Sequence, residues 1–428
     1  MLFNQTLTYI SLFSGAGVGC YGLLEEGFEC VATNEILEKR LNIQRINNKC
    51  KFDEGYICGD IKELEIKEKI LKRIEFYSKK FGNDRVDLVV ATPPCQGMSV
   101  ANHKKKNDEI KRNSLVVESV DLIKQIKPRF FILENVPSFY KTGCIDKNDN
   151  LLEIGSMIEQ NLSGDYMLYD EVINFKNFGS NSSRTRTLVI GVCKEFKDFT
   201  SALEFFPDFK QEKTLKEVIG SLKPLTWGEY DSTDFYHSFR TYPKHMQEWI
   251  KDLKEGQSAF ENVQDAISDL AYLCSNEGAF ESDYLNPIQS SYQALMRKNS
   301  PKLYNHQATN HSQAALEKLK LINKEQGKEC LPKNLHGKQQ FKSTWGRLNW
   351  NKISPTIDTR FDTPSNGTNS HPELHRSITP REAARIQSFS DDYIFYGNKT
   401  SVCKQIGNAV PPLLALALGK AILKNLRK

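Results

Sequence analysis

The residue in this chain that is best suited to chemistry is a cysteine that follows two prolines. Cys95 stands in the stretch 93–97 (PPCQG), directly after the apolar run 86–91 (VDLVVA). The prolines fix the backbone, and at the end of a strand this gives a stiff mounting for a nucleophilic thiol. A small buried cysteine is the more common role of a thiol. The two prolines at a strand end favour the role of a nucleophile for Cys95 over that of a buried structural cysteine.

A carboxyl group follows the next apolar run. Glu134 comes directly after 129–133 (RFFIL), so in a parallel sheet it projects at the same edge as Cys95. In a closed site such a carboxyl can stay protonated at neutral pH and donate its proton to a ring nitrogen. Taken alone, Glu134 is better explained as a charge at a helix N-terminus, by about two to one. Its expected place at the same sheet edge as Cys95 favours the role of a proton donor.

A glycine-rich turn follows the first apolar run, 6–12 (TLTYISL). In the stretch 13–17 (FSGAG), small residues let the backbone approach a ligand, and the next helix offers free amide groups. A turn that only joins a strand to a helix is about as common. Glu35 follows the second expected strand, where a carboxylate can accept both hydroxyls of a ribose, and Asp60 lies where a further strand would end. Each acid alone is more often a solvated loop residue.

These residues need a sheet to bring them together. Short apolar runs alternate with helical patterns, which is typical of a doubly wound, mostly parallel α/β sheet with ligands beyond the carboxyl ends of its strands. The expected strands are 6–12, 30–33, 86–91, 129–133 and 187–193. From about 194 to 350 aromatic, lysine and asparagine residues mix with frequent breaks, which indicates a second domain.

The far end of the chain carries two helix patterns. In 379–382 (TPRE) a threonine N-cap, a proline at the first helical position and a glutamate that closes a capping box predict a helix through 383–389 (AARIQSF). A last helix is expected at 413–428, after Pro411-Pro412. Its apolar pattern predicts that it packs back on the first domain.

Length, composition and charge restrict the class of protein. The 428 residues leave room for two or three compact units, and 39% hydrophobic with 26% charged residues indicates a soluble globular protein. No run of about 18 apolar residues and no export signal is found, so we expect a cytoplasmic protein without a membrane span. The ten cysteines contain no CxxC pair, which disfavours a zinc cluster or a disulfide scaffold. A formal charge of +5 is compatible with a nucleic-acid partner without requiring one.

Several blocks of the sequence, taken together, resemble the DNA cytosine-5 methyltransferases. They are FSGAG (13–17), NE (34–35), GDI (59–61), PPCQGMS (93–99), ENV (134–136), SRTR (183–186), TPREAARIQSF (379–389) and QIGNAVPP (405–412). The blocks occur in the family's order over residues 6–193 and 346–423, and the ordered set is highly specific.

The resemblance implies a fold and a division of the chain. The fold is a Rossmann-like, S-adenosylmethionine-dependent methyltransferase sheet with an inserted smaller domain. Residues 1–193 are then the first part of the catalytic and cofactor-binding domain, and residues 346–428 the return segment that completes it. Residues 194–345 occupy the place of the target-recognition domain, which reads bases in the major groove.

The resemblance also implies a mechanism. Cys95 looks like the nucleophile that attacks carbon 6 of a cytosine, so that carbon 5 takes the methyl group of S-adenosylmethionine and S-adenosylhomocysteine is left. Glu134 is similar to the acid that hydrogen-bonds ring nitrogen 3. Arg184 and Arg186 match the arginine pair that orients the base. The family commonly has Pro-Gln before this pair, where this chain has 181–183 (NSS), so we expect altered bonding there rather than inactivity.

The cofactor pocket follows from the same matches. The residues that resemble its walls are Phe13, Gly15, Gly17, Glu35, Ile36, Asp60, Ile61, Pro94, Leu115 and Asn408. Glu35 matches the ribose ligand and Ile36 an adenine contact. Asn408 has a second interpretation as the N-cap of the last helix, and both roles can hold at once. No metal is implied.

Double-stranded DNA is the implied partner, and a cytosine must leave the duplex to react. In the family a mobile loop after the nucleophile closes over DNA, and the matching residues here are Gln96, Ser99, Lys104, Lys105 and Arg112. A charge run is more often a solvated face, whereas phosphate contacts would make binding fall steeply with salt. Further basic candidates are Arg240, Arg297, Lys298 and Arg347, for which phosphate or surface roles are favoured over base reading by about two to one.

From the resemblance we expect a microbial modification enzyme of a restriction-modification or related defence system, with a cognate restriction endonuclease as its partner. One alternative is an RNA (tRNA) cytosine-5 methyltransferase, which the long inserted region disfavours because the RNA-acting branch is compact there. The other is a catalytically silent, DNA-binding relative. The intact Cys95, Glu134 and arginine pair disfavour that alternative, since a pure binder has no need of a nucleophile.

Overall fold

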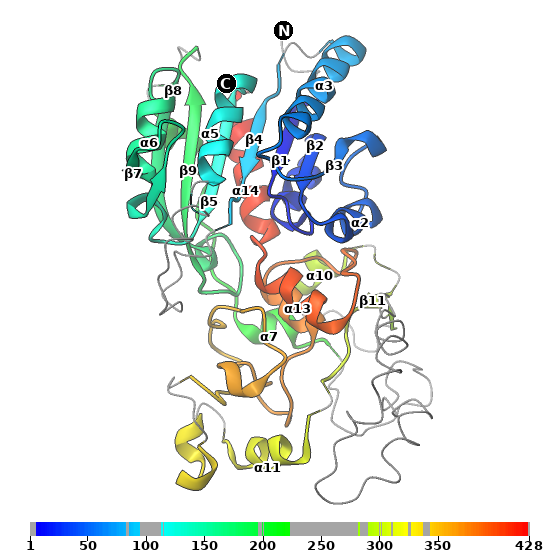
Figure 1. Ribbon diagram of the computed structural model, residues 1–428. Helices are drawn as coiled ribbons and strands as arrows, with labels where there is room; N and C mark the ends of the chain where they lie inside the picture. The colour runs from blue at the N-terminus through cyan, green and yellow to red at the C-terminus, as the bar shows by residue number, and fades with distance from the viewer. Residues whose placement is uncertain are drawn as a thin grey trace, which may run out of the picture. The chain divides into compact units, whose positions relative to one another are not determined.

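The computed structural model describes the chain in segments. The described residues are 6–82, 85–94, 113, 115–195, 199, 201–222, 281–282, 290–298, 300, 302–309, 311–323, 327–336 and 343–426. The chain divides into two compact units: unit 1 contains residues 1–213 and 409–428, and unit 2 contains residues 214–408 (Figure 1). Unit 1 therefore uses both ends of the chain.

Unit 1 is built on a seven-stranded sheet with the strand order β3-β2-β1-β4-β5-β9-β8. The strands are β1 (Thr8–Leu12), β2 (Glu29–Glu35), β3 (Tyr56–Cys58), β4 (Leu88–Ala91), β5 (Phe130–Asn135), β8 (Tyr166–Asn174) and β9 (Thr185–Cys193). All pairs from β3 to β5 are parallel, whereas β9 runs antiparallel to both of its neighbours. The expected mostly parallel α/β sheet is confirmed.

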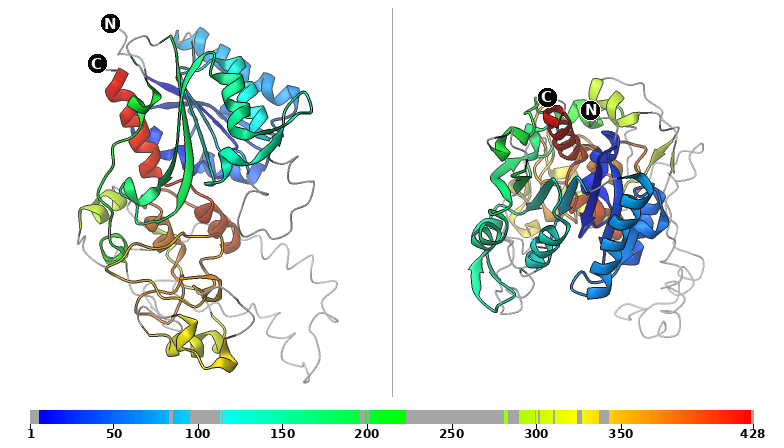
Figure 2. Two further views of the ribbon diagram at one scale, coloured as in Figure 1. Left: turned by 90° about the vertical axis from the view of Figure 1, so that its left-hand side faces the viewer. Right: turned by 90° about the horizontal axis from the view of Figure 1, so that it is seen from above.

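Helices cover both faces of this sheet (Figure 2, left). The helices of unit 1 are α1 (Tyr21–Glu25), α2 (Glu38–Ile46), α3 (Leu64–Phe81), α5 (Leu115–Ile126), α6 (Ile154–Leu162) and α14 (Pro412–Leu426). On β1, Ile10 joins the core shared with α3, α5 and α6, and its neighbour Tyr9 joins the core shared with α1 and α14. Val89 and Val90 of β4 divide in the same way. Strands buried on both faces are continuously apolar, which explains runs such as VDLVVA.

The last helix packs on unit 1, as its apolar pattern predicts. Leu414, Leu418 and Ile422 of α14 are buried against the sheet. The helix begins at Pro412, one residue before the expected start, and residues 427–428 lie outside the described part. The segment 399–426 is long and apolar enough to cross a membrane, but 72% of its apolar window is buried inside the structure. Such burial is typical of a core helix.

Two features of unit 1 are missing from the sequence-based prediction. Strand β8 forms an edge of the sheet, and its side chains alternate only weakly between core and surface, with Val172 54% exposed. The short strands β6 (Gly143–Ile145) and β7 (Leu151–Glu153) pair as a hairpin. Strands of three residues are too short to carry a recognisable period.

Unit 2 combines short helices with a polar core. Its helices and strands are α7 (Leu215–Ile219), β10 (Glu281–Ser282), α10 (Ser291–Arg297), β11 (Leu303–Tyr304), α11 (Gln313–Leu321), α12 (Pro380–Ile386) and α13 (Lys399–Gly407). Every residue of α12 is buried. Arg376 pairs with Glu382 at 2.7 Å and Arg385 pairs with Asp391 at 2.6 Å. These buried guanidinium groups have charged partners, as burial of a charge requires.

The start of α12 confirms the predicted capping box. Oγ1 of Thr379 accepts from the N–H of Glu382 (3.1 Å), while Oε2 of Glu382 accepts from the N–H of Thr379 (2.8 Å). The predicted end is wrong, because the helix stops at Ile386 instead of running through Phe389. Ser388 has a φ of 65°, in the left-handed region, which a continuing helix does not allow.

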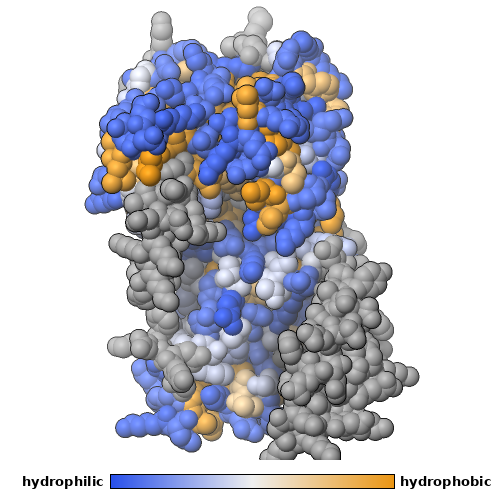
Figure 3. All heavy atoms as spheres, viewed as in Figure 1, coloured by the Kyte–Doolittle hydropathy of each residue, from blue (hydrophilic) through white to orange (hydrophobic). Residues whose placement is uncertain are grey.

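The boundaries of the two units fall after residues 213 and 408, whereas the expected domain boundaries fall after 193 and 345. The assignment of 194–345 to target recognition stays a prediction, since residues 223–280 of that region lie outside the described part. The described face in Figure 3 is mainly hydrophilic with scattered apolar patches. Single exposed apolar residues of this kind are normal on a protein surface.

Candidate active site at the carboxyl edge of the sheet

The turn after β1 has an unusual backbone. Phe13 and Gly15 have a φ of 54°, and Gly17 has a φ of 86°. Positive φ is uncommon for a residue such as Phe13, and it persists where the surroundings hold it. Here the N–H of Gly15 donates to Oε2 of Glu35 at 2.9 Å. This bond fixes the turn against the end of β2.

Glu35 is the last residue of β2, and only 4% of it is exposed. Its carboxylate accepts hydrogen bonds from the N–H groups of Gly15 (2.9 Å) and Leu37 (3.2 Å) and from Nη1 of Arg40 (3.1 Å). Donors of this kind hold an ionised carboxylate in one orientation. The next residue, Ile36, is 59% exposed, so an open apolar side chain lies beside the acid in sequence.

Asp60 lies two residues beyond the end of β3. Its Oδ1 accepts from the N–H of Lys62 at 3.0 Å. Gly59 before it has a φ of 148°, and a Cβ there would lie 2.3 Å from Cδ1 of Ile66, so the bend requires glycine. Ile61 is buried in the core of the sheet, and its side chain therefore anchors the loop that carries Asp60.

The loop after β4 is tied to the strands on both sides. Oγ1 of Thr92 donates to the carbonyl oxygen of Phe13 (3.1 Å), and Nδ2 of Asn135 donates to the carbonyl oxygen of Pro93 (2.9 Å). The described part of the loop ends at Pro94. Its backbone is therefore held between the turn after β1 and the end of β5.

Glu134 is the next-to-last residue of β5 and is 9% exposed. Its Oε1 lies 3.3 Å from Nε of Arg186. Burial raises the pKa of the Glu134 carboxyl above its usual value, and the positive charges of Arg186 and Arg184 oppose that shift. Removal from water disfavours the charged form of a carboxyl, which keeps its proton to a higher pH. The site therefore contains an acid with a raised pKa beside two cations.

Strand β9 carries Arg186, and Arg184 directly precedes the strand. It pairs antiparallel with β5, so that Leu188 lies opposite Glu134. Arg184 is 8% exposed, and the side chain of Arg186 is 16% exposed. Nη1 of Arg186 also donates to the carbonyl oxygen of Thr185 at 2.7 Å. The structure thus brings together Glu134 and the predicted arginine pair.

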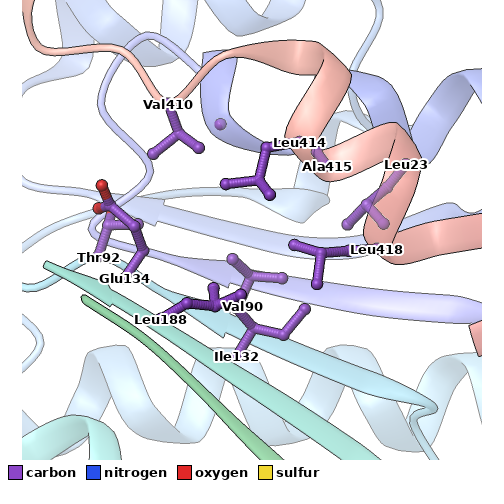
Figure 4. Close-up of a pocket in the computed structure, with 11 residues that line it drawn as sticks. Leu23, Val90, Thr92, Ile132, Glu134, Leu188, Val410, Leu414, Ala415 and Leu418 are labelled. Carbon is purple, nitrogen blue, oxygen red and sulfur yellow. The ribbon is translucent and has the colours of Figure 1, made fainter. Parts of the chain in front are cut away.

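A pocket opens beside Glu134, between the sheet and helices α1 and α14 (Figure 4). Glu134 and Thr92 lie together at one end, and most of the remaining lining is aliphatic. The aliphatic side chains come from Leu23, Val90, Ile132, Leu188, Val410, Leu414, Ala415 and Leu418. An apolar wall on this side gives the carboxyl no solvation, which is the physical cause of its raised pKa.

The sequence as a whole matches the model of one protein family, "C-5 cytosine-specific DNA methylase", over residues 7–424. The chain belongs to this family. It is a DNA cytosine-5 methyltransferase, an enzyme class that acts on DNA and takes its methyl group from S-adenosylmethionine.

Type II methyltransferases are among the similar proteins. M.DdeI of Desulfomicrobium norvegicum is 28% identical over 97% of this chain and 88% of its own length. M1.HphI of Haemophilus parahaemolyticus is 26% identical over 99% of this chain and 88% of its own length. Among solved structures, a prophage-encoded E. coli protein described as a DNA modification methyltransferase has a TM-score of 0.63 at 23% identity, with 99% of this chain and 100% of that chain covered. At that identity the likeness shows the fold.

Several predicted residues of this methyltransferase lie outside the described part of the chain. They are Cys95, Gln96, Ser99, Lys104, Lys105, Arg112 and Arg240. Their roles stay predictions, and the structure places only the backbone that leads to them, up to Pro94.

Asn408 and Leu115 are described, and each has a structural position of its own. Asn408 belongs to unit 2, is exposed, and forms the C-cap of α13 with a φ of −90°. Its interpretation as the N-cap of the last helix is wrong, because α14 begins only at Pro412. Leu115 begins α5 and packs partly buried against the core of the sheet. Their part in a cofactor pocket stays a prediction.

Arg347 is a structural residue of this methyltransferase and is unable to read bases. It is 5% exposed. Its guanidinium donates to the carbonyl oxygens of Leu319 (2.6 Å), Ile322 (2.8 Å), His371 (2.8 Å) and Leu374 (2.6 Å). A guanidinium has five N–H donors, and these bonds use most of them inside unit 2.

Three polar residues that the sequence analysis does not select hold the site together. Thr92 and Asn135 bond to the neighbouring loops, and Gln44 bonds to the turn after β1. Asn135 lies inside the ENV block (134–136) and Thr92 directly precedes PPCQGMS (93–99), so their positions at strand ends were a usable signal. Gln44 lies in α2, and its sequence surroundings carry no such signal.

Proposed function

We propose that this methyltransferase acts on a flipped-out cytosine of double-stranded DNA through a covalent adduct with Cys95. The observation that supports the proposal is Glu134, a buried acid with a raised pKa at the end of β5. The next residue, Asn135, is bonded to the loop that leads into Cys95. A thiol and an acid at one edge of a sheet are the pair needed to add a nucleophile to a ring and protonate that ring.

In the proposed reaction, the Cys95 thiolate forms a bond to carbon 6 of the cytosine, and the ring electrons move toward nitrogen 3. Protonated Glu134 donates to nitrogen 3 and stabilises the developing charge, while Arg184 and Arg186 orient the base. Carbon 5 becomes electron-rich and takes the methyl group. Loss of the carbon-5 proton to a base and expulsion of the thiolate then restore the double bond and leave 5-methylcytosine.

The residues at the edge of the sheet fit the cofactor. Glu35 is an oriented carboxylate that can accept ribose hydroxyls, and Ile36 offers an exposed apolar side chain for the adenine. A Cβ at Gly15 would meet nothing within 4 Å, so there is open space beside the turn. Bound S-adenosylmethionine supplies an activated methyl group and is converted to S-adenosylhomocysteine. The other proposed walls are Phe13, Gly17, Asp60, Ile61, Pro94, Leu115 and Asn408.

The DNA contacts of the proposal come from the sequence. Extruding a cytosine costs a few kcal/mol of unstacking, which protein contacts must offset. Gln96 and Ser99 beside the nucleophile and the cations Lys104, Lys105 and Arg112 are proposed to contact the DNA. Phosphate contacts of this kind order a loop on binding and are weakened by salt.

We further propose that the enzyme modifies one short recognition sequence within a restriction-modification or related defence system, with a cognate endonuclease as partner. The support is that M.DdeI and M1.HphI are named as Type II methyltransferases. Residues 194–345, which include the described Arg297 and Lys298 of unit 2, are proposed to contain the target-recognition domain.

The test is transfer of labelled methyl groups from S-adenosylmethionine to long, sequence-diverse duplex DNA, with base-resolution mapping of the product. We expect 5-methylcytosine at one recurring short sequence. The Cys95→Ser variant should lose methyl transfer and keep duplex binding, and wild-type methylation by that variant would remove Cys95 from the mechanism. Transfer to RNA but not to duplex DNA would replace the DNA substrate with an RNA one.

A further inference from the structure

A buried glutamine lies beneath the turn after β1. Gln44, in the last part of α2, is fully buried. Its Nε2 donates to Oγ of Ser14 (2.7 Å) and to the carbonyl oxygen of Gly15 (2.7 Å). Its Oε1 accepts from Oγ1 of Thr33 (2.7 Å). One side chain from a helix thus bonds to the turn at two points and to β2 at a third.

The amide orientation of Gln44 follows from the residue behind it. Lys49 is 3% exposed, and its Nζ lies 3.1 Å from Oγ1 of Thr33. An ammonium group only donates, so the Thr33 oxygen accepts from Lys49 and its hydrogen points to Gln44. Gln44 must therefore present its oxygen to Thr33 and its NH₂ group to the turn.

The same side chains explain the glycine at position 17. A Cβ on Gly17 would lie 2.6 Å from Cγ of Gln44 and 3.3 Å from Cδ of Lys49. Real Cβ atoms do not approach so closely, so a larger residue at 17 would displace Gln44. From the other side of the turn, Glu35 accepts the N–H of Gly15 at 2.9 Å. The peptide units on both sides of Gly15 are therefore held, one by Glu35 and one by Gln44.

We infer that Gln44, backed by Thr33 and Lys49, is a positioning residue for the cofactor. The inference rests on the proposed assignment of the turn 13–17 to S-adenosylmethionine. Without the Gln44 amide, the Gly15 carbonyl and the Ser14 hydroxyl each lose a donor, and fewer hydrogen bonds hold the turn in one conformation. Cofactor binding then has to order the turn, which lowers affinity for the cofactor while leaving DNA binding unchanged.

The test compares Gln44→Met with the wild-type enzyme. Methionine has a similar length and volume but makes none of these hydrogen bonds. The probe is S-adenosylhomocysteine, titrated by calorimetry, together with KM for S-adenosylmethionine and KM for DNA. We expect the Kd and the KM of the cofactor to rise by about tenfold or more, because buried groups are left unsatisfied. The KM for DNA and kcat at saturating cofactor should stay within about threefold of wild type.

Two further variants separate positioning from general stability. Tyr77→Phe removes a hydrogen bond to Glu29 (2.8 Å) in the same unit, away from the turn. Tyr77→Phe should lower the thermal midpoint of the enzyme, as Gln44→Met also should, but it should leave the affinity for the cofactor unchanged. Thr33→Val removes the hydroxyl that orients Gln44 and should raise the cofactor Kd by a smaller factor than Gln44→Met. If Gln44→Met fails to fold, Thr33→Val provides the same comparison.

The outcomes distinguish this inference from the proposed function. A wild-type enzyme that methylates DNA, with Gln44→Met and Thr33→Val binding S-adenosylhomocysteine as tightly as wild type, overturns the role of Gln44 alone. Equal losses of cofactor affinity in Gln44→Met and Tyr77→Phe also overturn it. A wild-type enzyme that neither binds S-adenosylhomocysteine nor transfers methyl groups overturns the assignment of the turn, and the role of Gln44 with it.

Discussion

At the scale of single residues, Glu134 acquires its chemistry from its surroundings. A carboxyl group in water is ionised at neutral pH, but β5 places this one against an apolar pocket. Burial raises its pKa, and Arg186 at 3.3 Å limits the shift. The two effects oppose each other, and burial is the larger, so the pKa of Glu134 lies above that of a carboxyl in water.

Glu134→Gln should lower kcat by about 10²- to 10⁴-fold, the usual contribution of a general acid. Because the proposed active form of Glu134 is protonated, wild-type activity should fall as the pH rises through its raised pKa. The variant, which has no proton to lose, should lack this alkaline limb. The measurement is kcat against pH for both enzymes, with S-adenosylhomocysteine affinity as a control that stays unchanged. A limb of the same shape in Glu134→Gln would assign it to another group.

At the scale of elements, α12 depends on its cap. The helix has only seven residues, too few to be stable alone, and its first turn is closed by Thr379 and Glu382. Oγ1 of Thr379 also bonds to Nδ1 of His306 (2.9 Å), and Glu382 also pairs with Arg376. The cap therefore joins the start of the helix to the polar core of unit 2.

Thr379→Ala should destabilise unit 2 by about 1–2 kcal/mol through the lost cap. Glu382→Gln should cost more, about 3–5 kcal/mol, because it leaves the buried Arg376 without its charged partner. Residues 1–213 and 409–428 contain no tryptophan, and Trp345 and Trp350 are described residues of unit 2, so tryptophan fluorescence during urea unfolding reports on that unit. The matched control is Ser201→Ala, which opens a capping box in unit 1. A smaller midpoint shift for Thr379→Ala than for Ser201→Ala would contradict the prediction.

At the scale of the whole molecule, unit 2 should be sensitive to acid. Burial lowers the pKa of His311 to about 4 and that of His371 to about 3, so both are neutral in the fold. The unfolded chain binds these protons below about pH 6.5. The contribution of these two histidines to the free energy of unfolding is therefore fully present above about pH 6.5. It is lost as the pH falls toward 4, by about 1.4 kcal/mol per pH unit for each histidine.

Urea unfolding followed by tryptophan fluorescence at pH 7.5, 6 and 5 checks this expectation. His371→Asn keeps an acceptor for the N–H groups of Glu373 and Leu374 but removes one titrating group. The slope of its unfolding free energy against pH should be smaller than that of the wild type by the amount that corresponds to about one bound proton. An unchanged slope in the variant would show that other groups control the acid sensitivity.

Binding of DNA, the proposed partner, should depend on the charges of the protein. If Lys104, Lys105 and Arg112 contact phosphates, replacing all three with glutamine should lower the slope of log K against log salt by about 0.9 for each residue. Lys69, Lys72 and Lys79 on α3 are exposed and paired with glutamates, and their replacement is the matched control. Equal slopes for wild type and the loop variant would assign the loop cations to a solvated face.

The sequence by itself determined where strands β1, β2, β4, β5 and β9 lie in the chain, the residues at the carboxyl ends of the parallel ones, and the family. These features are local: an apolar run of five or six residues, a glycine turn or a capping box is visible within a short window. The start of α12 follows in this way from Thr379 and Glu382 alone.

Only the tertiary structure decided which buried polar groups meet. Gln44 bonds to Gly15, 29 residues earlier, and Arg347 bonds to Leu319, 28 residues earlier. The pKa of Glu134 depends on Arg186 and on an apolar wall that includes α14, from the far end of the chain. Hydrogen bonding and desolvation depend on distances in space, and residues far apart in the chain come within bonding distance only when each unit folds.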